Sequence, residues 1–212
     1  MLERIELRQA SLRVYYRHAW IPQAGAADPL FVREDEGRWG TTWTLHTALS
    51  THVALSEYCR SKADDITRAD PTGGVGLTRA SLPAFSALEI QEPLPRRSLF
   101  GLTFTFERLC DLTGGRAQAA LRRAGFDTAD FFADDFGQCQ QLAHMGAVLG
   151  WEALLVPSAA WRHDDGLCAP ILSAGRPRLQ RQHLIDEAVR PTVAVAYGTT
   201  YKFGERPRWL TI

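Results

Sequence analysis

The chain has 212 residues and equal numbers of acidic and basic side chains, 24 of each, so its formal net charge is zero. This balance argues against a protein that binds nucleic acid through a broad basic field, and no apolar run is long enough to span a bilayer. We expect one domain over residues 1–212, because a chain of this length can bury a sizeable core without a disulfide or a metal.

The four cysteines are spread widely, without a C-x-x-C pair or zinc-ligand spacing. We therefore expect them to be small buried hydrophobes in a reducing compartment, and a Cys/His enzyme finds no support in their spacing. The N-terminus lacks a charged region followed by an apolar one, so no signal peptide is expected. Together these features predict a soluble, cytoplasmic protein.

The first predicted element is a strand over residues 12–17, because apolar and polar positions alternate there. The alternation places Arg17 on the same face as Tyr15. From the pattern alone, a solvated strand charge explains Arg17 as well as a guanidinium that grips a phosphate does. A loop rich in Pro, Gly and charged residues follows over 21–37.

The next stretch predicts a strand and then a helix. Residues 42–47 alternate in the manner of a half-buried strand, and Ser50 is a suitable helix N-cap. Val53, Ala54 and Glu57 then share one helical face. A carboxylate on a small, apolar face is unusual, although a surface glutamate is the commoner outcome.

Short strands and helices fill the rest of the chain. We expect strands over 84–90, 99–106, 153–156, 168–172 and 192–197, and helices over 115–124, 138–149 and 179–189. Without regular β-α-β alternation, this order predicts an α+β fold.

Three further features have residue types that could bind a ligand or a metal: Ser158, the stretch Gly73-Gly74-Val75-Gly76 and a group of aspartates. Ser158 follows Pro157 at a strand end, where a serine is usually a turn or cap residue. It does not lie in a G-x-S-x-G elbow, so we do not expect it to be a hydrolase nucleophile. The glycine-rich stretch lacks the Lys-Ser/Thr ending of a P-loop. The acids at 130, 134 and 135 are better explained as helix N-terminal and loop residues than as metal ligands.

Several short motifs, taken in order, resemble the RES domain family, and the resemblance spans most of the chain. Their order and spacing are more specific than any one of them. The motifs are Tyr15-Tyr16-Arg17, Gly37-Arg38-Trp39, Leu45-His46-Thr47-Ala48, Ala54-Leu55-Ser56-Glu57 and Leu155-Val156-Pro157-Ser158. Two departures stand out. The chain has His46 where the family usually has Tyr, and Gly40 where it often has Asn.

The resemblance implies a fold similar to the ADP-ribosyltransferase toxins, with a split, curved β-sheet core, flanking helices and a cleft that holds NAD. It implies a toxin that consumes NAD by cleaving the nicotinamide–ribose bond, through hydrolysis or phosphorolysis. A cognate antitoxin with a helix-turn-helix domain would neutralise it in a hetero-oligomer. Two alternatives stay open: an ADP-ribosyltransferase that modifies a cellular protein, and a catalytically silent nucleotide-binding interaction protein.

The resemblance also implies residue roles. Glu57 would stabilise the positive charge that develops on the ribose in an oxocarbenium-like transition state. Arg17 and Arg38 would hold the pyrophosphate. His46 would take the place of the family Tyr beside the nicotinamide or ribose, and Ser158 would hydrogen-bond the nicotinamide end or hold Glu57. Nicotinamide leaves as a neutral group, so NAD is the only small molecule required and no metal is expected.

Overall fold

The computed structural model of the chain describes residues 2, 5–22, 26–32, 38–40, 43–59, 87–93, 96–132, 136–160, 166–189, 192–198 and 208–211. Its strands are β1 (Leu7–Trp20), β2 (Ala87–Pro93), β3 (Arg97–Asp111), β4 (Ala153–Pro157), β5 (Leu167–Cys168), β6 (Leu179–Val189), β7 (Thr192–Gly198) and β8 (Arg208–Thr211). Its helices are α2 (Gly115–Arg123), α3 (Gly137–Val148), the short 3-10 helices η3 (Thr128–Phe132) and η4 (Ser173–Arg178), and a helix over 51–59.

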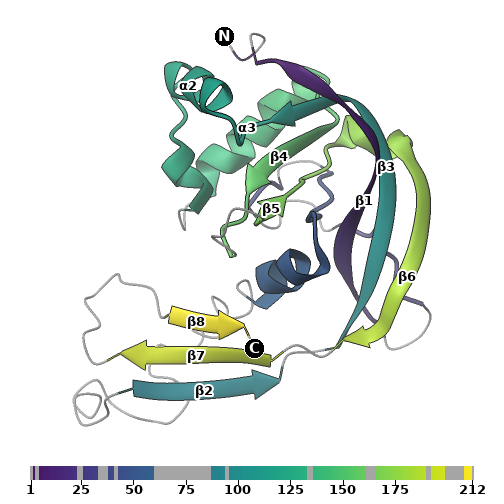
Figure 1. The fold of residues 1–212 in the computed structure, drawn as a ribbon, viewed down its shortest axis with the longest axis vertical. Helices are drawn as coiled ribbons and strands as arrows, with labels where there is room; N and C mark the ends of the chain where they lie inside the picture. The colour runs from purple at the N-terminus through teal and green to yellow at the C-terminus, as the bar shows by residue number, and fades with distance from the viewer. Residues whose placement is uncertain are drawn as a thin grey trace.

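Within the described residues, the strands form two sheets (Figure 1). The larger sheet has the order β1-β3-β4-β5, with β6 also paired to β3, and the smaller has the order β2-β7-β8. The β3–β4 pair is parallel, whereas β1 and β6 run antiparallel to β3. These two sheets and the separate helices confirm the α+β class and the split, curved sheet.

The long strands β1, β3 and β6 form the curved wall on the right of Figure 1. The strand predicted at 99–106 is confirmed within β3, but burial does not alternate there, because Leu102, Thr103 and Phe104 are all buried, as is Phe106. Tyr15 of β1 contacts both rings edge-on, with centroid distances of 6.1 Å to Phe104 and 5.5 Å to Phe106. This aromatic contact fixes β1, and therefore Arg17, against the centre of the sheet.

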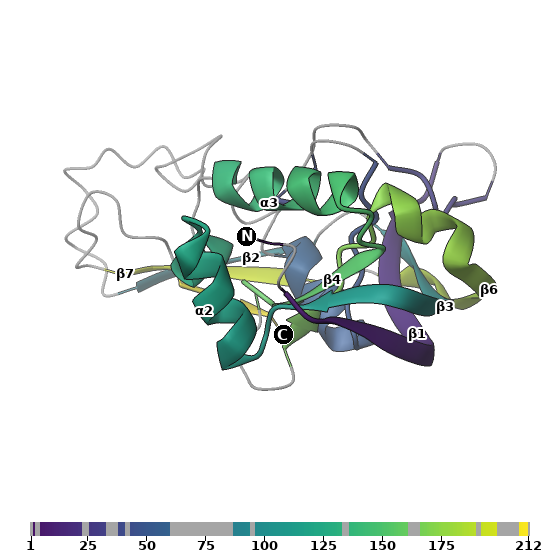
Figure 2. The same ribbon diagram turned by 90° about the horizontal axis from the view of Figure 1, so that it is seen from above.

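A second core cluster lies between the far end of the sheet and the helices. Figure 2 shows α3 lying along one side of the sheet, with α2 beside it. The buried side chains Leu121, Leu142 and Trp151 belong to this cluster. Both helices are followed by a glycine with positive φ, Gly125 at 88° and Gly150 at 72°, a conformation that glycine adopts without steric cost.

The helix over 51–59 lies in the middle of the molecule, drawn in blue in Figure 1. Its predicted cap is confirmed, because the Val53 N–H donates to Ser50 Oγ at 3.2 Å. Val53 and Ala54 are buried against Ala48. This packing sets the rotation of the helix and thereby the direction in which Glu57 leaves it.

The helix predicted over 179–189 is wrong, because these residues form strand β6. They pair with residues 97–104, which make up the first half of β3. Nearly all of the β6 side chains are exposed. A strand with little burial on either face needs no alternation of polarity, so its sequence carries no period-2 signal. Hydrogen bonding to β3 decides the conformation instead.

The half-buried strand predicted over 42–47 is also not a regular strand. The described part makes isolated bridges, from Leu45 to Ile171 and from Ala48 to both Tyr16 and Cys168. Thr44, Leu45 and Thr47 are all buried, so consecutive side chains are enclosed rather than alternate ones. The segment runs between β1 and β5 as an extended connection.

The glycine-rich stretch at 73–76 and the acids at 134 and 135 lie outside the described residues, as does the side chain at 130. The other predicted helices are confirmed as α2 and α3, and the strands at 153–156 and 192–197 as β4 and β7. The strand at 168–172 is reduced to β5 and two isolated bridges at Ile171, to Leu45 and to Ala153.

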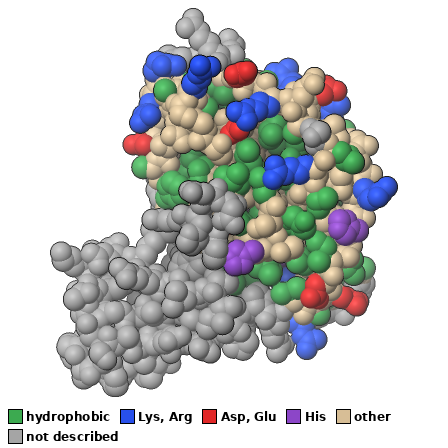
Figure 3. Space-filling model, viewed as in Figure 1, with side chains coloured by type: hydrophobic (Ala, Val, Ile, Leu, Met, Phe, Trp, Pro, Cys, Tyr) green, Lys and Arg blue, Asp and Glu red, His purple; other side chains and the backbone are tan. Residues whose placement is uncertain are grey.

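On the face seen in Figure 3, the described basic and acidic side chains are interspersed around the rim. This distribution agrees with the balanced charge of the sequence. In the described parts of the chain, the helices are all too short or too polar to cross a membrane.

Two glycines allow a matched test of the packing around β6. A Cβ at Gly175 would overlap the backbone oxygen of Glu152, whereas a Cβ at Gly101 would meet only the ring of His183, an exposed side chain that can turn away. We expect Gly175→Ala to lower the free energy of unfolding by roughly 1–3 kcal/mol, as overpacking typically does. Gly101→Ala should cost clearly less. Urea denaturation of both variants provides the measurement, and equal losses would contradict this account.

Candidate active site

A pocket opens between β1, the 38–48 segment, the helix over 51–59 and the end of β4. The volume of this pocket is about 70 Å³. Small-molecule sites usually measure roughly 300–1,000 Å³, so the pocket is small by comparison. Polar lining comes from Tyr16, Arg17, His18, Arg38, His46, Thr47, Glu57 and Cys168.

The five residues singled out in the sequence come together here. Arg17, Arg38, His46 and Glu57 line the pocket. Ser158 lies directly behind it, buried, between the lining residues Pro157 and Ala159. Positions that are up to 141 residues apart in the sequence (17 and 158) therefore meet at one site. Together they provide cations, a carboxylate, an imidazole and a hydroxyl.

The Glu57 carboxylate is held through one of its oxygens. Ser158 Oγ donates to Oε1 at 2.5 Å, and the backbone N–H of Ala160 donates to the same oxygen at 3.2 Å. Ser158 is itself fixed, because its N–H donates to Gly166 O at 2.6 Å. The short, charge-assisted bond orients the carboxylate toward the pocket.

Arg17 is anchored by backbone carbonyls. Its Nη1 donates to His46 O at 3.0 Å and its Nη2 to Phe31 O at 2.6 Å, while Nε is buried without a hydrogen-bond partner in the described structure. Burial lowers the pKa of Arg17 to about 10, with Asp28 opposing the shift and Arg97 adding to it. The guanidinium is therefore still charged at neutral pH, with donor capacity left for an anion.

His46 is a neutral ring at physiological pH. Burial, followed by the charges of Arg17 and Arg38, lowers its pKa to about 4. Its Nε2 is buried and has no partner within the described residues. A ring of this kind can hydrogen-bond a ligand, but it is too weak a base to accept a proton efficiently near pH 7.

Arg38 is held at the rim of the pocket by aromatic contacts. Its guanidinium carbon lies 4.6 Å from the centroid of the Phe136 ring, within the range of a cation–π interaction. The next residue, Trp39, is buried against Phe131 at 5.5 Å. Trp39 thus anchors one ring in the core, and the adjacent cation of Arg38 lines the pocket.

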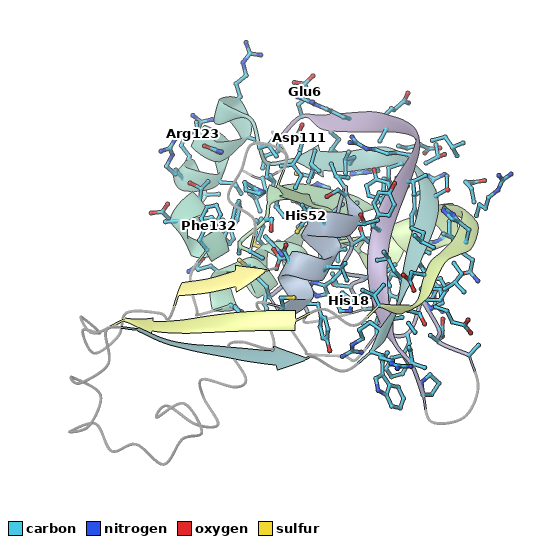
Figure 4. The ribbon with its side chains drawn as sticks, turned by 60° about the horizontal axis from the view of Figure 1, so that its bottom comes forward. Glu6, His18, His52, Asp111, Arg123 and Phe132 are labelled. Carbon is cyan, nitrogen blue, oxygen red and sulfur yellow. The ribbon has the colours of Figure 1, made fainter. Side chains whose placement is uncertain are left out.

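Two pocket residues were missed by the sequence reasoning. Cys168 was expected to be only a small buried hydrophobe, yet its Sγ lies 3.5 Å from Glu57 Oε1. His18 packs on Tyr58 with ring centroids 4.7 Å apart. Figure 4 shows His18 reaching from β1 toward the helix over 51–59. In the sequence, the feature that could have pointed to His18 as a site residue was its position directly after Arg17.

The Cys168 thiol of the pocket is not arranged as a nucleophile. Burial and the neighbouring Glu57 raise the pKa of the Cys168 thiol well above its ordinary value, so the sulfur is protonated and a poor nucleophile. Among the described residues, no group of three or more His, Cys, Asp or Glu side chains is arranged to hold a metal ion.

No protein-family model matches the sequence, and no curated protein matches it significantly. Among solved structures, the fold is similar to a chain of the M. tuberculosis MbcT–MbcA toxin–antitoxin complex. The TM-score is 0.56 at 18% sequence identity, and the match covers 88% of this chain and 90% of that chain. At this identity the similarity establishes a shared fold.

The low pKa of His46 predicts an acid-sensitive fold. The unfolded chain takes up the His46 proton near its ordinary pKa of 6.5, whereas the folded state does so only near 4. Stability is therefore lost as the pH falls from about 6.5 to about 4, by as much as about 3 kcal/mol at about 1.4 kcal/mol per pKa unit.

His46→Tyr isolates this contribution, because tyrosine does not titrate in this range. Urea denaturation at pH 7 and pH 4.5 should show a larger loss for the parent than for the variant. Equal losses would mean that the buried imidazole does not resist protonation.

Proposed function

We propose that the protein is a RES-type toxin that consumes NAD by cleaving the bond between nicotinamide and ribose. The observation that carries this proposal is that Glu57, which is hydrogen-bonded to Ser158, lines the same pocket as Arg17. These three residues come from three of the motifs that carry the family resemblance, and the chain order of the motifs gave no guarantee that they would meet.

Cleavage breaks the N-glycosidic bond, and its electron pair leaves with nicotinamide as a neutral molecule. Positive charge develops on the ribose, and a carboxylate already oriented by fixed donors can stabilise it with little reorganisation. An oxygen of water or phosphate then bonds to the anomeric carbon and loses its proton. Glu57 supplies the charge in this proposal, and Ser158 supplies its orientation.

The pyrophosphate is assigned to Arg17 and Arg38. A guanidinium that retains N–H donors and its full charge suits phosphate oxygens, and Arg17 keeps both despite its burial. The neutral His46 ring takes the place of the family Tyr, where it contacts the nicotinamide or the ribose. No step in this scheme requires a metal.

Released nicotinamide is the direct test. The purified protein is incubated with NAD, with and without phosphate, and with a cell extract that offers protein acceptors. Release that depends on phosphate indicates phosphorolysis, and label transferred to protein indicates the ADP-ribosyltransferase alternative. Binding of NAD without any release would leave a catalytically silent binder.

A cognate antitoxin is the proposed partner, with a helix-turn-helix domain and a hetero-oligomeric complex in the cytoplasm. The shared fold with a chain of a toxin–antitoxin complex supports it. We expect expression of the protein alone to stop growth and lower cellular NAD, and Glu57→Gln to abolish both effects. Unchanged growth and NAD with the parent protein would count against the toxin assignment.

Glu57→Gln gives the sharpest test of the chemistry. The substitution keeps the shape of the side chain and removes its charge, so it should lower kcat roughly 100- to 1,000-fold, as loss of one preorganised electrostatic contact typically does. The melting temperature should change little. A normally folded variant that still cleaves NAD at the parental rate would refute the role of the carboxylate.

Arg17→Lys is the matched control for the anion site. It preserves the positive charge and removes the planar fork, so KM should rise more than kcat falls. An equal fall in kcat and kcat/KM would instead place Arg17 at the reacting centre.

A further inference from the structure

Three donors converge on a single oxygen of Glu57. The Ser158 hydroxyl and the Ala160 N–H reach Oε1 from the segment after β4, and the Cys168 thiol reaches it from β5 at 3.5 Å. Within the described structure, every hydrogen bond to this carboxylate goes to Oε1. The other oxygen, Oε2, is therefore the one left for a ligand in the pocket.

The thiol acts as a donor because it stays protonated. Burial is the main reason that the Cys168 pKa is high, and Glu57 adds to it, while the hydrogen bond with Ser158 and the charge of Arg38 oppose the shift. A thiolate at this position would instead repel the carboxylate. Cys168 also lines the pocket and bridges to Ala48 through the backbone, so its side chain has little freedom to leave.

We propose that Cys168 is a positioning residue, whose thiol joins Ser158 and Ala160 in fixing Oε1 of Glu57 so that Oε2 faces the ligand. This proposal rests on the proposed function for its catalytic consequence. The hydrogen bond from the thiol to Glu57, which is the structural part of the proposal, does not depend on that function. Neither the cysteine spacing nor the family resemblance assigns Cys168 any role.

The first test needs no activity. The infrared S–H stretching band of Cys168 is identified as the band that disappears in Cys168→Ser. A hydrogen bond to a carboxylate lowers this frequency, and a neutral amide is a weaker acceptor. Glu57→Gln should therefore move the Cys168 band to higher frequency, with the bands of the other three cysteines unchanged. A Cys168 band that does not move overturns the proposal, whether or not the protein cleaves NAD.

The second test uses turnover. Cys168→Ala removes the donor and should lower kcat roughly 2- to 10-fold, the equivalent of one modest hydrogen bond, with little change in KM. Cys168→Ser keeps a donor and should recover most of that loss. Cys110→Ala, which removes a fully buried thiol of β3 that is not among the pocket-lining residues, is the control for lost packing.

The outcomes separate the two proposals. A parent protein that releases no nicotinamide, but shows the shift of the S–H band, contradicts the proposed function alone. A parent that cleaves NAD, with Cys168→Ala and Cys168→Ser equally impaired, contradicts the positioning role alone. Loss of kcat in Cys110→Ala equal to that in Cys168→Ala would assign the effect to packing and also overturn the positioning role.

Discussion

The hydrogen bond between Ser158 Oγ and Glu57 Oε1 is the contact on which the site depends. It joins residues 101 positions apart and ties the helix over 51–59 to the end of β4. Each partner is positioned by its own element: Glu57 by the buried face of Val53 and Ala54, and Ser158 by β4 and a backbone bond to Gly166. An ionised carboxylate near a protein interior is stable only when donors satisfy it, and these donors also decide which oxygen faces the pocket.

The charges in the pocket influence one another. Arg17 is buried at a desolvation cost that lowers its pKa, and the carbonyls of His46 and Phe31 offset part of that cost. The charges of Arg17 and Arg38 help to keep His46 neutral by lowering its pKa. A phosphate would satisfy the buried Nε of Arg17, so ligand binding removes an unfavourable feature of the free protein as well as adding contacts. A donor that is buried without a partner would in this way raise the affinity for an anion that accepts its hydrogen bond.

The sequence predicted those elements whose own residues decide their conformation. The aromatic and threonine-rich run that forms the centre of β3, the Ser50 cap, and the helix ends at Gly125 and Gly150 follow local rules, and all are present. β6 was misassigned because pairing with β3 decides its conformation and its side chains are mostly exposed. The five candidate site residues were found by resemblance, whereas Cys168 was missed because its contact with Glu57 spans 111 residues and follows no spacing rule.

Much of the site is built from backbone groups, and this explains how a fold can persist while its sequence diverges. Arg17 is held by two carbonyls, and Glu57 accepts one of its hydrogen bonds from the N–H of Ala160. Backbone donors and acceptors survive substitution of the side chains that they belong to. Only a few side chains must then be retained, in order along the chain, to keep the pocket chemically intact. The fold shared at 18% identity, with a TM-score of 0.56, shows that most side chains can differ while the backbone framework stays similar.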